Sequence, residues 1–150
     1  MTTLSGALRY LAAVTLAALF AASAGAVEIG QIKIATGQVT VERKGDALPG
    51  RVGMRLEAAD VLKTGADGSV GITMADNSLL SAGPNSILSL DRFDFDPTSN
   101  QGRFDAQLQK GSLAVISGRM AKQSSEAMTV RTPSAILGVR GTEFVLSADD

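Results

Sequence analysis

The stretch Val130–Leu146 reads VRTPSAILGVRGTEFVL, and it shapes the interpretation of the whole chain. It is mainly apolar, with a proline near its start and two glycines inside. Apolar runs of this kind are typical of buried strands. Arg140 stands in the middle of the run and needs a partner there, because an unpaired buried charge is costly.

The segments before this stretch alternate short apolar patterns with turn residues. Period-two alternation predicts strands over 32–34, 39–41, 61–64, 69–74, 79–80, 86–90, 104–108, 112–116 and 128–131. Short strands at this spacing are typical of all-β folds. We therefore predict an all-β domain with short strands in two packed sheets, as a sandwich-like β-solenoid. A jelly-roll-type β-sandwich is the alternative, since the number of strands does not separate the two.

Other segments lack a strand pattern or interrupt one. We expect Gly37 to form a bulge or tight corner, Thr132-Pro133 to end the strand before it, and Lys110-Gly111 to turn a hairpin. The remaining expectations are a loop with a possible helical turn over 51–59, a polar loop over 91–102, an exposed loop over 117–126, and two strand pieces within 136–146 hinged near Gly138 or Gly141.

Residues 1–26 are predicted to be a secretory signal peptide. Arg9 supplies positive charge, residues 11–22 are an apolar run with one threonine, and small residues follow. Ala24 and Ala26 fit an A-x-A cleavage site. We expect cleavage after Ala26, which leaves residues 27–150 as one domain in the periplasm or outside the cell. An uncleaved signal anchor is the alternative, although the run is short for a membrane span.

Composition excludes several classes of function. The chain has no cysteine, histidine or tryptophan, which rules out Ser-His-Asp and Cys-His nucleophile systems and nearly all zinc sites. Its 14 basic and 15 acidic residues are well mixed, so no basic patch indicates nucleic acid. We expect no enzymatic activity, no cofactor, no nucleic-acid partner and no small-molecule substrate.

The motifs of the chain, in their order, resemble the FecR-like domain family. The most specific piece is Thr132-Pro133-Ser134-Ala135 followed by Val139-Arg140-Gly141-Thr142-Glu143-Phe144. Weaker pieces precede it at 37–41, 59–65, 69–78, 86–90 and 111–115. The resemblance extends over residues 35–147. Ala59 and Asn77 depart from the residues usual in the family, both at turns.

The resemblance implies an all-β domain on the outer side of the inner membrane of a Gram-negative bacterium. In the namesakes this domain belongs to a membrane-spanning regulator, which receives a signal from an outer-membrane iron-siderophore transporter and controls an extracytoplasmic-function sigma factor. Here the apolar run starts within the first dozen residues, which leaves no room for a sigma-binding segment, and the chain stops soon after Phe144. We therefore expect an exported, stand-alone domain.

Arg140 is the first candidate site residue, with two hypotheses. In the structural one, its guanidinium pairs with Glu143 or Asp60 and binds carbonyl oxygens of a crowded loop, as the fork of donors allows. Gly141 then permits close backbone approach, and the Thr142 hydroxyl binds a neighbouring loop. In the functional one, Arg140 contacts a partner protein.

The polar loop offers weaker candidates. Its oxygens could surround calcium or form a glycosidase pair, and the residues concerned are Asp91, Asp94, Asp96 and Asn100. The spacing is not that of an EF-hand, so a solvated loop is favoured and we predict no metal site. A Ser-Lys dyad at Lys110 or Lys122 is disfavoured, because neither lysine has an apolar setting that would lower its pKa.

The terminal strand, expected over 141–147, is the best functional candidate. At a sheet edge its free backbone groups can receive a strand from another chain. We predict a non-enzymatic binding or signalling module that contacts another envelope protein and touches a membrane only through an uncleaved signal segment. The alternative is a structural or self-assembling envelope-associated protein. The structural or partner-binding motif comprises Thr132, Pro133, Val139, Arg140, Gly141, Thr142, Glu143 and Phe144.

Overall fold

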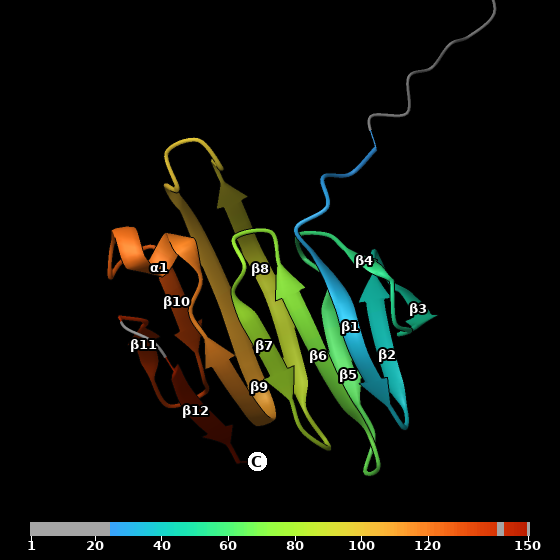
Figure 1. Ribbon diagram of the computed structural model, residues 1–150. Helices are drawn as coiled ribbons and strands as arrows, with labels where there is room; N and C mark the ends of the chain where they lie inside the picture. Colours follow the sequence, from blue (N-terminus) through green and yellow to red (C-terminus); the bar gives the residue numbers. More distant parts are fainter. Residues whose placement is uncertain (1–24, 141–142, 150) are drawn as a thin grey trace, which may run out of the picture.

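The structure is a computed structural model that describes residues 25–140 and 143–149. These residues form twelve strands and one short helix (Figure 1), so the all-β prediction is confirmed. In chain order the elements are β1 (Gly30–Thr36), β2 (Val39–Arg43), β3 (Asp46–Pro49), β4 (Arg55–Leu56), β5 (Val61–Thr64), β6 (Ser69–Met74), β7 (Leu79–Ala82), β8 (Ile87–Phe95), β9 (Gly102–Ile116), α1 (Arg119–Gln123), β10 (Met128–Arg131), β11 (Ile136–Gly138) and β12 (Glu143–Ala148).

Strand β9 organises the sheet. Strands β7 and β8 both run antiparallel to it, β7 beside its second part and β8 beside its first part. Strand β12 pairs antiparallel with the second part, and β10 pairs parallel with the first part. Two halves result, which share β9: β4-β1-β6-β7-β9-β12 and β3-β2-β5-β8-β9-β10-β11.

The two halves meet at a row of bends at the lower end of Figure 1, which we call the corner row: 37–38, 64–65, 83–86 and 111–112. The Thr64 hydroxyl donates to the carbonyl oxygen of Gly83 (2.6 Å) and accepts from the amide of Ser86 (2.9 Å). The Ser86 hydroxyl accepts from the amide of Ser112 (3.0 Å). Side-chain oxygens therefore satisfy backbone groups at the point where the ladders are interrupted.

Glycines allow the sharpest bends of the corner row. Gly111 has φ +93°, and a Cβ at this position would collide with the backbone and hydroxyl of Ser86. Gly37, with φ +62°, forms the predicted corner between β1 and β2. The predicted hairpin at Lys110-Gly111 is wrong: the strand continues through both residues, because a residue with positive φ can bend a strand without reversing it.

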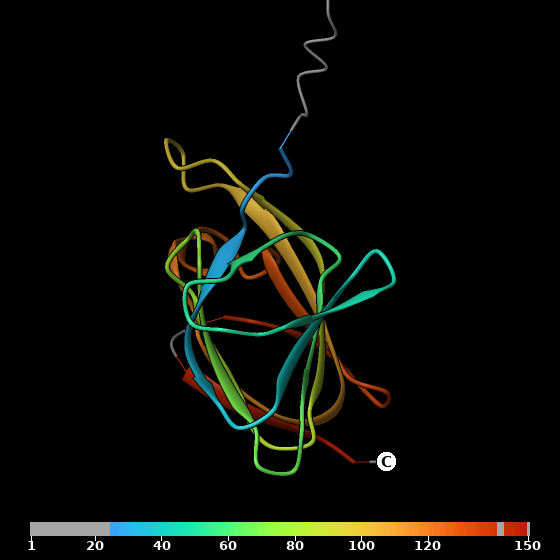
Figure 2. The ribbon, with the colours of Figure 1, turned by 90° about the vertical axis from the view of Figure 1, so that its right-hand side faces the viewer.

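The sheet curls around one hydrophobic core, as Figure 2 shows from the side. Both halves contribute to its largest buried side chains, which are Phe104, Ile32, Leu56, Leu62, Met74, Leu80, Leu88, Leu90, Leu108, Leu113, Met120 and Met128. Because β9 belongs to both halves, hydrogen bonding joins the strands of the described chain into one curled sheet. The prediction of two packed sheets, as a solenoid or a jelly roll, is not confirmed.

Three segments predicted as loops contain regular structure. Residues 91–95 extend β8, because the polar residues alternate with Phe93 and Phe95, which pack against the core. Within 117–126, α1 buries Met120 and Ala121 at the end of the core, so this segment is not a wholly exposed loop. In 51–59 the short strand β4 forms, paired with β1, in place of a helical turn.

The helix α1 is anchored by the turn between β6 and β7. The Arg119 amide donates to the carbonyl oxygen of Asp76 (2.9 Å), and the Gly118 amide donates to the Ser78 hydroxyl (2.9 Å). Asp76 and Ser78 are both buried and bonded to each other (2.9 Å). In the part of the chain that is described, no helix is long and apolar enough to cross a membrane.

Candidate partner-binding surface

The motif of the terminal stretch begins at the turn between β10 and β11. The Thr132 amide donates to the carbonyl oxygen of Ala135 (2.8 Å), and the Thr132 hydroxyl accepts from the Ala135 amide (3.1 Å). Pro133 is exposed within this turn. Strand β10 ends at Arg131, as predicted, because the threonine closes the turn and the proline cannot continue the ladder.

After β11 the chain crosses from one half of the sheet to the other, and Val139 and Arg140 lie in this crossover. Val139 is 3% exposed, belongs to the core, and its amide donates to the carbonyl oxygen of Met128 (2.9 Å). Arg140 is exposed. Gly141 and Thr142 lie outside the described residues. The stretch thus forms two strand pieces, as predicted, with the buried Val139 between them.

The partner of Asp60 is Arg43, not Arg140. Arg43 binds the fully buried Asp60 carboxylate through Nε (2.9 Å) and Nη2 (2.7 Å), and Nη1 lies 3.2 Å from Glu57. The hydrogen bond to Asp60 raises the pKa of Arg43 above its ordinary value. The hypothesis that Arg140 pairs with Asp60 is therefore wrong, since the bidentate site is already occupied.

Strand β12 lies at one edge of its half of the sheet, in the lower left part of Figure 1 below β11. Within the described chain it pairs with β9 alone. Its side chains alternate: Phe144 and Leu146 are half-buried against the core, whereas Val145 is 69% exposed and Glu143 and Ser147 are also exposed. The terminal strand is therefore an edge strand.

The hydrogen bonds of β9 reveal which amides of β12 face outward. Both the amide and the carbonyl oxygen of Ser112 point toward the β7–β8 side, because they bond Ser86 and Gly83. Ser112 is opposite Ser147, so the backbone groups of Ser147 point away from β9. Alternation then places the outward-facing backbone groups of β12 on Glu143, Val145 and Ser147, and the β9-facing ones on Phe144, Leu146 and Ala148.

The other edges of the described sheet are less open to strand addition. Strand β4 has two residues and β11 has three. Strand β3 includes Pro49, which lacks an amide hydrogen, and begins with Asp46. Short strands, charges and prolines are the usual protection of sheet edges. Strand β12 has six residues and no proline, so neither shortness nor a proline protects it.

A groove of about 280 Å³ runs beside β12. Residues 137–140 form one wall, and residues 143–146 of β12 form the other. Leu137, which is 37% exposed, lines it together with Phe144 and Leu146. The free backbone edge thus borders a groove whose lining is mainly apolar and includes the charged residues Arg140 and Glu143.

The outer face of the β12 half carries apolar residues that sequence patterns did not reveal. The register aligns Ile34, Gly71, Ser81, Ala114 and Val145 in one row across five strands. Ile34 is 61% exposed, at the end of the row opposite Val145. Period-two patterns predict that one face of each strand is buried, but only the pairing shows that these outward residues lie together.

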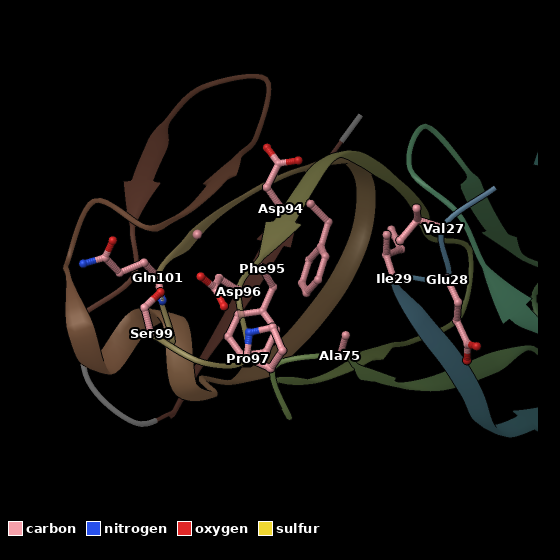
Figure 3. A pocket seen from close by; sticks show the side chains of 12 residues that line it. Val27, Glu28, Ile29, Ala75, Asp94, Phe95, Asp96, Pro97, Ser99 and Gln101 are labelled. Carbon is pink, nitrogen blue, oxygen red and sulfur yellow. Dashed lines mark hydrogen bonds between the residues drawn. The ribbon is translucent and has the colours of Figure 1, made fainter. Parts of the chain in front are cut away.

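A second, open hollow lies at the end of the sheet away from the corner row (Figure 3). Its apolar lining includes Phe93 and Phe95, which are 6.5 Å apart between ring centroids. The Arg119 guanidinium lies 5.2 Å from the centre of the Phe95 ring. Polar side chains also line this hollow, among them Ser99 and Gln101 (Figure 3).

The acidic residues of this region do not assemble a calcium site. Asp94 binds Arg92 Nε (2.7 Å), and Asp96 accepts the Thr98 amide (2.8 Å), which lowers the pKa of Asp96. Asp91 lies on β8, several residues before this turn. Among residues 25–140 and 143–149, no group of three or more Asp or Glu side chains is placed to hold a metal ion.

Comparison with known proteins identifies the family. The family model described as FecR protein matches residues 60–150, from Asp60 to the end of the chain, and so includes β5 to β12 and the whole Thr132–Phe144 motif. No curated protein and no solved structure matched the chain. Because the match spans more than half of the sequence, the chain belongs to the FecR family, a signalling and regulatory family whose members are associated with the cell envelope.

Proposed function

We propose that this chain is a non-enzymatic periplasmic signalling module that contacts another envelope protein by accepting a strand along the edge of β12. Membership of a regulatory family supports the signalling role. The observation that carries the proposal is the row of outward-facing backbone groups at Glu143, Val145 and Ser147, since main-chain hydrogen bonds are the source of affinity in strand addition.

We also propose that the chain is exported. Residues 1–26 act as a signal peptide, with Ala24 and Ala26 before the cleaved bond, and residues 27–150 form the exported domain. The apolar run of 11–22 and the small residues after it support this. The residues Thr132, Pro133 and Val139 then position β12, while Arg140 is exposed beside the groove and available to a partner.

The test is crosslinking in cells with tagged, exported protein. Val145→Pro removes an outward-facing amide and leaves the β9-facing amides in place. We expect it to abolish crosslinking to a distinct envelope protein, and Glu143→Pro to do the same. Val145→Thr keeps the amide and should keep the crosslink.

Folding of each variant is checked by circular dichroism and thermal unfolding. A crosslink that survives in folded Val145→Pro protein would show that the partner does not use this edge. Hydrolysis of a substrate by the purified protein would contradict the non-enzymatic part of the proposal.

A further inference from the structure

The surroundings of β12 limit what kind of strand can bind there. We infer that the groove receives an isolated, extended segment of the partner, such as a tail or a linker, and not the edge of a folded sheet. This inference rests on the proposed function, because it uses the same edge of β12. It adds the form and the side-chain chemistry of the ligand.

An added strand would take a defined place beside β12. Strands β10 and β12 occupy the same side of β9, one in each half of the sheet. The half with β10 continues for one more strand, β11, whereas the half with β12 ends there. A strand added to β12 therefore lies across from β11, and the groove lined by residues of β11, the crossover and β12 is found at that place.

Strand β11 already covers this place. If the edge of a folded sheet paired with β12, the layer that packs against that sheet would collide with β11. An isolated segment needs only the width of one strand, about 4.8 Å. Leu137 of β11, which lines the groove, would then cover the inner side of the segment.

The residues that line the groove determine which side chains a bound segment should carry. Side chains on the inner face of an added strand would contact Leu137, Phe144 and Leu146, so they should be apolar. Side chains on the outer face would lie beside Glu143 and Val145, both exposed. A basic residue next to Glu143 is favoured, because opposite charges on neighbouring strands attract. The ligand is thus an alternating segment, apolar on one face and partly basic on the other.

The experiment uses two neighbouring residues of β11 as a matched pair. Leu137 lines the groove, whereas Ile136 is 70% exposed and is not part of its lining. Neither contributes backbone groups to the edge of β12. Leu137→Asp places a charge against the apolar inner face of a bound segment, and Ile136→Asp places the same charge on the other side of the strand.

A direct measurement uses a synthetic, fluorescein-labelled peptide, SVKVSVK, and a control of the same composition with the valines adjacent. Fluorescence anisotropy with residues 27–150 should show binding of the alternating peptide and weaker binding of the control. Leu137→Asp should lower its affinity at least about tenfold, Ile136→Asp should leave it within about twofold, and Glu143→Lys should lower it about fivefold. Equal effects of Leu137→Asp and Ile136→Asp, or no binding of the alternating peptide, would overturn the inference.

Crosslinking in cells with Val145→Pro, Leu137→Asp and Ile136→Asp distinguishes this inference from the proposed function. Loss of the crosslink in both Val145→Pro and Leu137→Asp, with retention in Ile136→Asp, supports both. If the crosslink is lost in Val145→Pro but retained in Leu137→Asp, strand addition to β12 still stands, whereas binding of an isolated segment is overturned. If the captured protein is a second copy of this chain joined through folded β12 strands, the inference is also overturned, because β11 would not have excluded a folded edge.

Discussion

Gly111 sets the bend of β9, and Gly45 provides a matched control for it. Both have positive φ, +93° and +85°, but a Cβ at Gly111 would collide with Ser86, whereas nothing lies within 4 Å at Gly45. We expect Gly111→Ala to lower the free energy of unfolding by more than about 3 kcal/mol, and Gly45→Ala by about 1 kcal/mol from backbone strain alone. Urea unfolding measures both, and equal losses would show that Ser86 does not crowd the bend.

Arg43 should matter more for stability than any exposed arginine. Arg43→Ala leaves the buried Asp60 carboxylate with the Glu57 amide (2.9 Å) but without its cation. We expect a loss of about 2–4 kcal/mol, because removing one member of a buried pair leaves an uncompensated charge. Arg55→Ala is the control, since Arg55 is 77% exposed and lies 3.4 Å from Glu28. Arg55→Ala should lower the free energy of unfolding by less than about 1 kcal/mol, and thermal unfolding measures both variants.

At the scale of residues, the sequence does not predict which of the two arginines, Arg43 or Arg140, pairs with a buried carboxylate. An arginine within an apolar run indicates burial, yet Arg140 is exposed because it lies in a crossover, next to the buried Val139. Arg43 is the last residue of an ordinary alternating strand, within a charged segment, and gives no signal of its own. Its pairing with Asp60 depends on which strands are neighbours, and local patterns do not contain that information.

At the scale of elements, the alternation of backbone directions in β12 predicts a pattern of hydrogen exchange. The amides of Phe144, Leu146 and Ala148 face β9 and should be protected, whereas those of Glu143, Val145 and Ser147 should exchange at least about tenfold faster. Two-dimensional NMR of residues 27–150 in deuterated water measures this directly. Uniform protection along β12 would mean that its outer edge is already paired, which would contradict the proposed binding surface.

The elements that sequence patterns predicted best are those with one buried face and clear turns. Strands β5, β6 and β7 have this form. The long pairing of β8 with β9 was missed because acidic residues alternate with Phe93 and Phe95, and the charges suggested a loop. The helix α1 was missed because it has five residues and no side-chain cap of its own, and is held by Asp76 from a distant turn.

At the scale of the whole molecule, the shared strand β9 predicts a single unfolding transition. Both halves bury side chains in one core, and they are joined through the corner row, so neither half retains its packing without the other. NMR signals of Val41 in one half and Ile72 in the other should disappear at the same temperature. Earlier loss of one set would show that the halves are separate cooperative units.

The sequence indicated the all-β class and the candidate surface, but not the way in which the sheet closes. Strand–turn spacing is compatible with sandwiches, solenoids and barrels alike. What decides between them is the glycine bend at 111, which passes β9 from one half to the other, and this bend resembles a hairpin turn in sequence. The edge position of β12 likewise follows from the pairing and not from its apolar pattern.

The place of β9 along the chain also governs when folding can finish. A polypeptide leaves a ribosome or a translocation channel with its N-terminus first, and here the strand that both halves require is completed only at Ile116. Strands β1 to β6 emerge before β9, which completes both halves, and we expect them to stay accessible to chaperones until β9 follows. We therefore expect the late position of this central strand to delay closure of the core until β9 has emerged.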